Sequence, residues 1–293
     1  MPAIRQMCVI WHLSDPLTLL YVIMKGIHLQ LSYALESVRS QYERYPYPAY
    51  SEDEVKIAAK WLSRFELNAD TIVDVGCGTG LWSIAFALNG SKVTAIDFSK
   101  ASLLVASKMA DIFGVSIRFC HSDLFGFQTS NRFSLVFCNG VLHHTGNAQN
   151  GFRRISKLVD NEGLLVTSFY NRLSPFRFAK WLVRGLGGTN IDTRRHVAEA
   201  VVDVPLVTTS LDFLGRSQGG PFSSVRDYLS RQENLIDLLC HAHTSYHSLW
   251  EIENWYLAEG FTSFATIPAG SITSAILPNL IFYFGRRPRV SNT

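Results

Sequence analysis

The chain has 293 residues, which is enough for about two average domains or for one α/β domain with large additions. Its composition is 47% hydrophobic and only 17% charged, which excludes a disordered or low-complexity protein because so many apolar side chains can form a real core. Lysine and arginine exceed aspartate and glutamate only by 27 to 24, so a protein whose main task is to grip a nucleic-acid backbone is disfavoured.

Cysteine content and hydropathy both favour a cytoplasmic protein. The five cysteines are an odd number without a C-x-x-C pair, which disfavours a disulfide framework and a zinc ribbon. The longest apolar run near the N-terminus, Pro16–Met24, is far shorter than the roughly 20 residues of a membrane-spanning helix. Only Arg5 precedes it, where a signal peptide would have a basic leader. We expect no transmembrane segment, and peripheral contact of an N-terminal helix with a membrane stays open.

From about residue 51, short β-rich runs alternate with segments of helical periodicity, a pattern typical of a parallel sheet covered by helices. The expected strands are 71–75, 92–96, 116–119, 133–138, 164–169, 261–267 and 280–284. The expected helices are 81–88, 99–114, 149–158 and 248–260, bounded by N-cap serines, a capping box and stop glycines. A turn at 161–163 leads into the fifth strand, and residues 171–246 are expected to be irregular, with Gly, Pro and Ser scattered among short helical pieces.

The pattern divides the chain into four parts without internal repeats. We expect an N-terminal helical extension with a Tyr/Pro strap (1–50), a cofactor-binding core (51–170), an insertion or substrate cap (171–246) and the C-terminal part of the core (247–293). The insertion follows the fifth strand, at the edge where open α/β sheets bind ligands, so it is expected to form the wall of a substrate pocket.

A glycine-rich turn, Val73-Asp-Val-Gly-Cys-Gly-Thr-Gly80, joins the first strand to the first helix of this core. Glycines let the backbone bend sharply and let a ligand approach closely, and the N–H groups at the start of the helix are expected to face that ligand. Leu81 stands where a dinucleotide fingerprint would have its third glycine, and Asp74 would repel a pyrophosphate but suit an ammonium group. These features disfavour a nicotinamide-dependent oxidoreductase, which stays as an alternative.

Two further carboxylates follow the next strands. Asp97 closes the second strand, 97 − 76 = 21 residues after the first loop glycine, the spacing at which a carboxylate reaches a ribose diol. Asp123 follows the third strand, where it can accept from the exocyclic amine of adenine. Three carboxylates at three successive strand ends are far more specific than any one of them.

With these motifs in place, the sequence resembles the class I S-adenosylmethionine-dependent methyltransferases, within a superfamily like the ubiquinone and menaquinone methyltransferases. The matching segments are 74–80, 95–99, 122–123, 133–144 and 158–165, and the resemblance spans about 71–170 and resumes with the 248 helix. It implies a Rossmann-like, doubly wound, seven-stranded sheet with helices on both faces and an antiparallel last strand. Ser134 and Asn161-Glu162 depart from the family pattern at structural positions.

The resemblance also implies a role for each motif in binding S-adenosylmethionine. Gly76, Gly78 and Gly80 would hold the methionine part, Asp74 its ammonium, and Asp97 the ribose. Phe98 would flank the adenine, Asp123 and Leu124 would read its edge, and Asn139 and Gly140 would pass beneath the sulfonium. The same motifs add Cys77, Thr79, Ser99 and Ser122 to the expected cofactor-binding residues.

An upstream segment, Gln41-Tyr-Glu-Arg-Tyr-Pro-Tyr-Pro-Ala-Tyr50, looks like the Y-x-x-x-P-Y-P segment that precedes the core in a bacterial small-molecule subgroup of this family. Proline fixes an extended path and tyrosine presents a rigid ring with a polar tip. We interpret the segment as a strap over the cofactor cleft, with Tyr42, Tyr45 and Tyr47 as contacts to cofactor or acceptor. A packed connector between the extension and the core explains it equally well.

The His143-His144 pair follows the fourth strand, beside the expected position of the methyl group. Neighbouring residues rarely face the same site, so at most one of the two is a candidate general base. The alternative is that the pair caps the strand and packs against the next helix. His241-x-His243, with Cys240 and His247 nearby, fits no standard zinc spacing, so no metal is expected.

The acceptor is expected to be a small molecule. Asn139-Gly-Val-Leu142 lacks the Asn/Asp-Pro-Pro-aromatic motif typical of amino methylation of nucleic-acid bases, and no stable nucleic-acid partner is expected. Six basic residues against one acid across 172–195 keep an RNA or protein acceptor open, and they also suit an anionic small acceptor. A non-catalytic cofactor-binding subunit is the remaining alternative.

Overall fold

The structure is a computed structural model. It describes residues 36, 38–44, 49–174, 176–188, 190–204, 235–241, 243–268 and 280–289. Two of the strap tyrosines, Tyr45 and Tyr47, and the apolar run at Pro16–Met24 lie outside the described residues.

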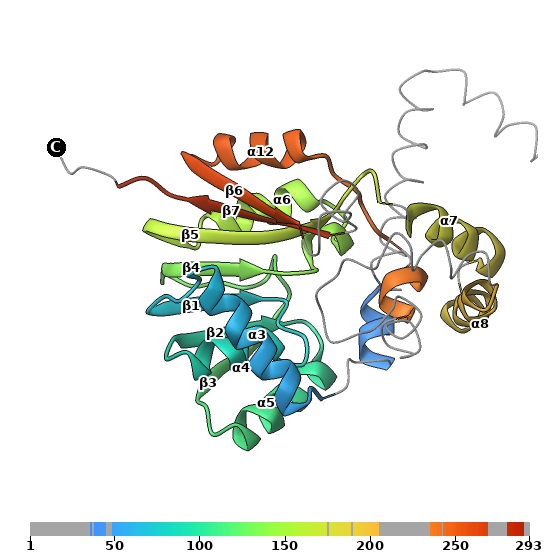
Figure 1. Ribbon diagram of the computed structural model, residues 1–293, viewed down its shortest axis with the longest axis horizontal. Coiled ribbons are helices and arrows are strands. Elements are labelled where there is room, and N and C mark those ends of the chain that lie inside the picture. The colour runs from blue at the N-terminus through green and yellow to red at the C-terminus, as the bar shows by residue number, and fades with distance from the viewer. Residues whose placement is uncertain are drawn as a thin grey trace, which may run out of the picture.

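Seven strands form one sheet in the order β3-β2-β1-β4-β5-β7-β6 (Figure 1). They are β1 (Thr71–Val75), β2 (Lys92–Asp97), β3 (Ile117–His121), β4 (Phe133–Cys138), β5 (Val159–Tyr170), β6 (Ser263–Pro268) and β7 (Leu280–Arg286). The pairs among β1 to β5 are parallel, whereas β7 runs antiparallel to both β5 and β6. This confirms the expected doubly wound sheet with an antiparallel last strand. Because β1 lies between β2 and β4, the loops after these strands open at the same edge, where the strand order reverses.

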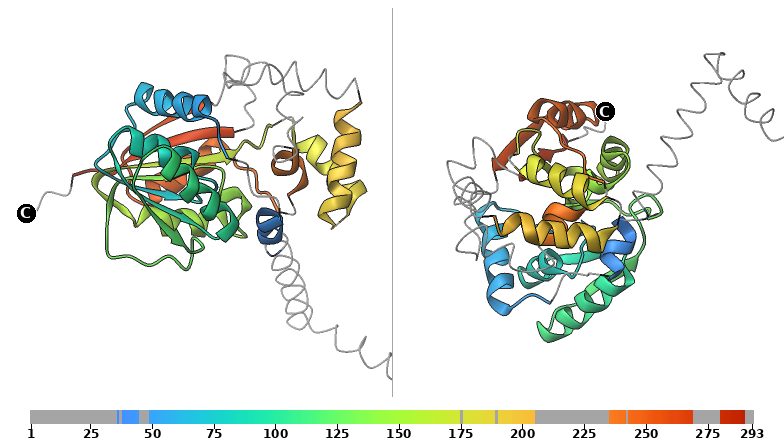
Figure 2. Two further views of the ribbon diagram at one scale, coloured as in Figure 1. Left: turned by 90° about the horizontal axis from the view of Figure 1, so that it is seen from below. Right: turned by 90° about the vertical axis from the view of Figure 1, so that its right-hand side faces the viewer.

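Helices cover both faces of the sheet (Figure 2). One face carries α3 (Glu52–Arg64), α4 (Leu81–Leu88) and α5 (Lys100–Ile112), and the other carries α6 (Ala148–Ser156) and α12 (Leu249–Ala258). Each face has its own apolar cluster, centred on Phe86 and Phe137 on the first and on Phe152 and Tyr256 on the second. Because both faces are buried, the central strands are nearly continuous apolar runs, as parallel strands generally are.

Two serine caps explain where helices begin. At α3, Ser51 and Glu54 form a complete capping box, in which each side chain accepts from the other residue's backbone N–H. At α12, the expected box is only half formed: the Ser248 hydroxyl accepts from Glu251 N at 3.2 Å. The Glu251 carboxylate lies 2.9 Å from His247 Nδ1, so a neighbouring ring competes for the group that would close the box.

The fifth strand begins earlier than expected, at Val159, and includes the expected turn at 161–163. Glu162 adopts a left-handed φ of 59° there, and the pairing with β4 jumps from Val159 to Leu164. The turn signal is therefore real, but it produces an irregularity inside the strand instead of a turn before it. Backbone pairing with β4 is present before the turn, at Val159, and resumes after it, at Leu164, so the strand continues on both sides of the turn.

The expectation of an irregular 171–246 segment with only short helical pieces is wrong for its described part. It contains two twelve-residue helices, α7 (Phe176–Gly187) and α8 (Ile191–Val202), and the short π-helix η3 (Ile236–Cys240). Ala179 and Val183, four residues apart on α7, bury into an apolar cluster shared with α8 and η3, and this packing outweighs the glycines in the sequence. Figures 1 and 2 show α7 and α8 beyond the carboxyl ends of the parallel strands.

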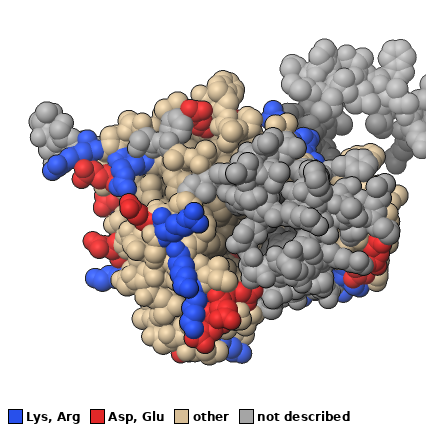
Figure 3. Space-filling view, in the orientation of Figure 1, with Lys and Arg blue, Asp and Glu red and all other residues tan. Residues whose placement is uncertain are grey.

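Surface charge is mixed on the face drawn in Figure 3, where Lys and Arg lie among Asp and Glu over the described core. Within the part of the chain that the structure describes, no helix combines the length and the apolar character that crossing a membrane requires.

The close approach of β7 to α12 generates a stability prediction. A Cβ on Gly285 would overlap the ring of Tyr256, a fully buried residue whose hydroxyl bonds Thr167 Oγ1 at 2.9 Å and Tyr283 O at 3.0 Å. We expect Gly285→Ala to lower the free energy of unfolding by about 1–3 kcal/mol through overpacking. Gly185 on α7 has open space around its Cβ position, so Gly185→Ala should leave stability equal or raised by up to about 1 kcal/mol. Urea unfolding of both variants measures the contrast, and equal stability of the two would contradict this account.

Candidate cofactor and acceptor site

The glycine-rich loop forms the expected tight turn between β1 and α4. Gly76, Gly78 and Gly80 all have positive φ, at 72°, 53° and 93°, a region that other residues adopt only with strain. A Cβ on Gly76 would also overlap the side chain of Val141, which follows β4. The glycines are therefore required by the backbone itself.

The backbone N–H groups of this loop are largely engaged inside the protein. Gly76 N and Cys77 N both donate to Ile96 O, at 2.8 and 3.0 Å, and Gly80 N donates to Cys77 O at 3.0 Å. Thr79 is buried as well. The loop is thus held in one shape by β2, because unsatisfied amides in a buried turn would be costly.

Asp74 is buried near the end of β1 and faces the first turn of α4. Its Oδ2 accepts from Ser83 Oγ at 2.5 Å, and the backbone N–H of Ser83 also bonds it. Burial raises the pKa of this carboxyl to about 7, against the lowering effect of the Ser83 bonds, and the charge of Asp97 raises it further. The carboxyl is therefore poised to lose its proton when a cation comes close.

Asp97 ends β2 and joins three segments. Its Oδ2 accepts from Gly78 N and its Oδ1 from Ser99 N, both at 2.8 Å, and Ser99 in turn caps α5. Asp97 is 7% exposed, and burial raises the pKa of its carboxyl. A carboxylate has about four acceptor positions, so each oxygen keeps capacity for a ligand hydroxyl.

The expected adenine-edge residues follow β3. Gly126 N donates to Asp123 Oδ1 at 2.6 Å, which fixes the carboxylate and leaves Oδ2 outward. Ser122 Oγ donates to the backbone oxygen of Asp123 at 3.0 Å, and Leu124 packs against the core cluster. Asp123 Oδ2 lies 2.9 Å from Arg39 Nη2, a partner that sequence reasoning missed.

A buried serine organises the loop after β4. Ser168 Oγ donates to Asn139 Oδ1 at 2.7 Å and accepts from Gly140 N at 2.8 Å, while Gly140 has φ 75°. Ser168 lies on β5, so it holds the two residues expected beneath the sulfonium from the neighbouring strand. The apolar run of the strand predicts that this position is buried but gives no signal for this hydroxyl.

His143 and His144 lie in a 3-10 turn, Leu142–His144, and both are buried. His144 Nδ1 lies 3.0 Å from His243 O, and since a carbonyl only accepts, Nδ1 carries the proton and Nε2 keeps its lone pair. Burial lowers the pKa of His144 well below its ordinary value, and nearby His241, His143 and Lys180 lower it further. His144 is therefore a neutral imidazole at pH 7.

Residues from distant parts of the chain surround this histidine. The His241 ring lies 3.8 Å from that of His144 between centroids, and Tyr42 OH lies 3.3 Å from His241 Nε2. Tyr42 also meets Phe98 edge to face at 5.8 Å, so the described strap tyrosine lies between the expected adenine-flanking ring and the histidines. Its signal in the sequence was the tyrosine- and proline-rich segment.

A buried lysine of α7 lies beside the same cluster. Lys180 is 2% exposed, and its Nζ lies 4.6 Å from the Tyr170 ring centre and 3.4 Å from Thr244 Oγ1. Tyr170 ends β5 and packs against His143, with 4.1 Å between the ring centroids. The 171–246 segment thus places a cation at the carboxyl ends of β4 and β5.

The described part of the chain holds no group of three or more His, Cys, Asp and Glu side chains arranged for a metal.

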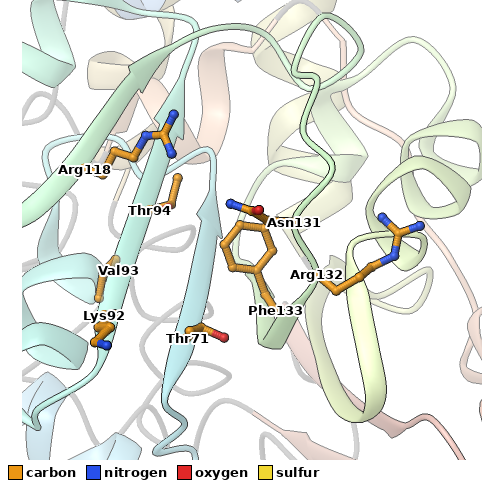
Figure 4. A pocket seen from close by; sticks show the side chains of 8 residues that line it. All are labelled: Thr71, Lys92, Val93, Thr94, Arg118, Asn131, Arg132 and Phe133. Carbon is orange, nitrogen blue, oxygen red and sulfur yellow. The ribbon is translucent and has the colours of Figure 1, made fainter.

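A pocket of about 330 Å³ lies near the amino ends of β1, β2 and β4, at the opposite edge from Asp97 (Figure 4). Its lining residues are Thr71, Lys92, Val93, Thr94, Arg118, Asn131, Arg132 and Phe133.

Comparison with known proteins identifies the core. Residues 72–163 match a protein family described as a methyltransferase domain. The ubiquinone biosynthesis O-methyltransferase of Rickettsia akari is 28% identical over 144 residues, which cover 49% of this chain and 49% of the relative. Residues 72–163 of this chain therefore form a methyltransferase domain. The mitochondrial ubiquinone biosynthesis O-methyltransferase of Schizosaccharomyces pombe is 33% identical over 104 residues, covering 34% of this chain and 38% of that protein.

The methyltransferase domain also has its fold in common with a solved structure, magnesium protoporphyrin IX methyltransferase from Synechocystis PCC 6803 with bound SAH. That match has a TM-score of 0.51 at 17% identity and covers 87% of this chain and 99% of the other. The chain spans about half the length, or less, of the curated relatives named above.

Asp74 generates a pH prediction. Its pKa is about 7 in the folded chain and near 3.8 when unfolded, so the unfolded state loses this proton first as pH rises. The Asp74 contribution to stability is therefore present below pH 4 and is lost between pH 4 and 7, at about 1.4 kcal/mol per pKa unit. Asp74→Asn keeps an acceptor for Ser83 and removes this loss, so its unfolding free energy relative to the parent chain should rise across that window. Asp111→Asn, on the exposed side of α5, is the control, and an Asp74→Asn difference that does not change with pH would refute the assignment.

Proposed function

We propose that this chain transfers a methyl group from S-adenosylmethionine to a hydroxyl group of a small-molecule acceptor. The observation that carries the proposal is the placement of Asp97. Its buried carboxylate closes β2, bonds the glycine loop at Gly78 and retains acceptor capacity for a ribose diol. A polar ligand with a nucleoside end fits this edge of the sheet.

The remaining cofactor residues fit the two ends of such a ligand. Asp74 with its raised pKa lies under the loop, where the ammonium of a methionine part would favour its ionised form. Phe98 offers a ring face, and Asp123 directs Oδ2 outward to accept from an adenine amine. S-adenosylmethionine supplies an already activated methyl group, so the chain's own task is to position the acceptor and exclude water.

His144 is the candidate general base for a hydroxyl acceptor. Its neutral ring keeps Nε2 free of a proton at pH 7, and the bond from Nδ1 to His243 O fixes the ring orientation. Lys180 places positive charge nearby, which favours an oxyanion on the acceptor. The names of the matched relatives, ubiquinone biosynthesis O-methyltransferases, support a hydroxyl acceptor.

The cap, residues 171–246, is proposed to wall the acceptor side, since α7 brings Lys180 to the histidines. Methylation of RNA or protein is the weaker candidate, because much of the basic 172–195 segment is engaged internally. Arg194 is 5% exposed and donates to Gly188 O and Cys240 O, while Arg195 pairs with Glu199. The domain boundaries and the cytoplasmic location stay predictions.

Calorimetric titration tests the cofactor assignment. We expect S-adenosylmethionine to bind and NAD not to bind, and Asp97→Ala to weaken S-adenosylmethionine binding by at least about 1.5 kcal/mol, because a charge-assisted ribose contact is lost. Asp111→Ala, which removes an exposed carboxylate of α5, is the matched control and should bind as the parent does. Binding of NAD alone would overturn the methyltransferase proposal, and unchanged affinity in Asp97→Ala would overturn the ribose role.

Turnover tests the base. With methyl-labelled S-adenosylmethionine and a panel of phenols and catechols, we expect His144→Gln to lower kcat at least about 100-fold while cofactor affinity stays within about twofold. Because the pKa of His144 lies well below 6.5, the parent rate should stay level from pH 8 down to 6.5. His196→Gln, an exposed histidine of α8, is the control. Parent-like turnover in His144→Gln would leave this residue a packing role only.

A further inference from the structure

The short helix formed by residues 38–44 lies at the carboxyl ends of the strands, between the sheet and the pair α7 and α8 (Figures 1 and 2). Three of its side chains face the methyltransferase domain from positions three and four residues apart, which share one side of a helix. These are Arg39, Tyr42 and Glu43.

Each of the three contacts a residue at or beside the proposed adenine subsite. Tyr42 meets the Phe98 ring edge to face at 5.8 Å, and Glu43 Oε1 accepts from the backbone N–H of Lys100 at 3.1 Å. Arg39 makes two contacts at once: its guanidinium carbon lies 5.9 Å from the Phe98 ring centre, and Nη2 lies 2.9 Å from Asp123 Oδ2.

The two contacts of Arg39 are the two that an adenine would make. Adenine is a planar group that packs on an aromatic ring and donates an N–H to a carboxylate, and a guanidinium is also planar with N–H donors in its plane. Asp123 Oδ1 is occupied by Gly126 N, so Oδ2 is the outward oxygen for which both groups compete. An adenine bonded to Oδ2 and packed on Phe98 would need the space that the guanidinium holds.

We propose that Arg39 is an internal stand-in for adenine, so that cofactor affinity is set by competition between Arg39 and the adenine for Phe98 and Asp123. This inference rests on the proposed function, because it uses the adenine subsite assigned there. The competing ion pair is weak, since the Arg39 and Asp123 side chains are 52% and 38% exposed and water screens them. Adenine can therefore displace Arg39 at a small cost in affinity.

The same helix also contacts the cap, on the side away from Arg39. These contacts determine which part of the helix is released when adenine displaces Arg39. Arg44 pairs with Asp192 of α8 at 3.0 Å, and Tyr42 OH bonds His241 Nε2. Release of Arg39 frees the core side of the helix while these cap-side contacts stay. Arg44 is 57% exposed, close to the 52% of Arg39, and its ion pair is made with Asp192 of α8 and not with Asp123, so it is a matched control.

Equilibrium titration with S-adenosylhomocysteine and with adenosine, at 50 and 500 mM salt, tests the proposal. We expect Arg39→Ala to bind both ligands about two to five times more tightly than the parent at low salt, in the range of an exposed ion pair. The advantage should shrink at high salt, because screening weakens the pair in the parent. Arg39→Lys, which keeps the charge but not the plane, should fall between the two, and Arg44→Ala should match the parent.

The outcomes separate the two proposals. If the parent binds S-adenosylhomocysteine and Arg39→Ala binds it equally or more weakly, Arg39 does not compete and the present inference is overturned while the proposed function stands. If neither the parent nor any variant binds these ligands, the adenine subsite is absent and both proposals are overturned. Thermal unfolding of each variant confirms that the comparison is made on folded protein.

Discussion

A single buried carboxylate holds the site of this protein together. Asp97 accepts from the glycine loop at Gly78 and from the start of α5 at Ser99, so one side chain fixes the loop after β1, the end of β2 and the first turn of the next helix. Burial makes each of these bonds stronger than it would be in water and makes their loss costly. The positions of the other polar groups at this edge depend on this arrangement, because they follow the same parallel strands.

The carboxyl groups of Asp74 and Asp123 have different surroundings, which suit the proposed binding of an ammonium group by Asp74 and of an adenine amine by Asp123. Asp74 has Ser83 as its neighbour and a pKa of about 7, so its charge depends on whether a cation is near. Asp123 is half-exposed and paired with Arg39. Binding of a cationic, nucleoside-containing ligand would change the environment of both, which links the proposed cofactor site to proton release from Asp74 at one end and to helix 38–44 at the other.

The acceptor side is built by segments that lie far apart in the sequence. The loop after β4 brings His144, the cap brings Lys180, and residue 241 lies between His144 and Tyr42 of the N-terminal part. Because helix 38–44 contacts both Phe98 and His241, a shift of this helix reaches the cofactor side and the histidines together. A low pKa at His144 follows from burial among these groups, so the chemistry proposed for it depends on the cap as much as on its own loop.

The amino-acid sequence by itself determined the layout of the core. Short apolar runs and stop glycines predicted all seven strands, six of them close to their observed bounds, and the three strand-end carboxylates and the glycine loop follow from local backbone needs and strand order. Tertiary structure decided the rest. The helices in the described part of the 171–246 segment depend on packing between α7, α8 and η3, which no local pattern specifies, so the expectation of only short helical pieces there was wrong. Ser168, Lys180 and Arg39 acquire their positions only through neighbours more than 25 residues away, as the Ser168–Asn139 and Arg39–Asp123 separations of 29 and 84 residues show. Periodicity records which side of an element is buried, whereas hydrogen-bond partners and shifted pKa values depend on which elements meet, and that is fixed only when the whole chain packs.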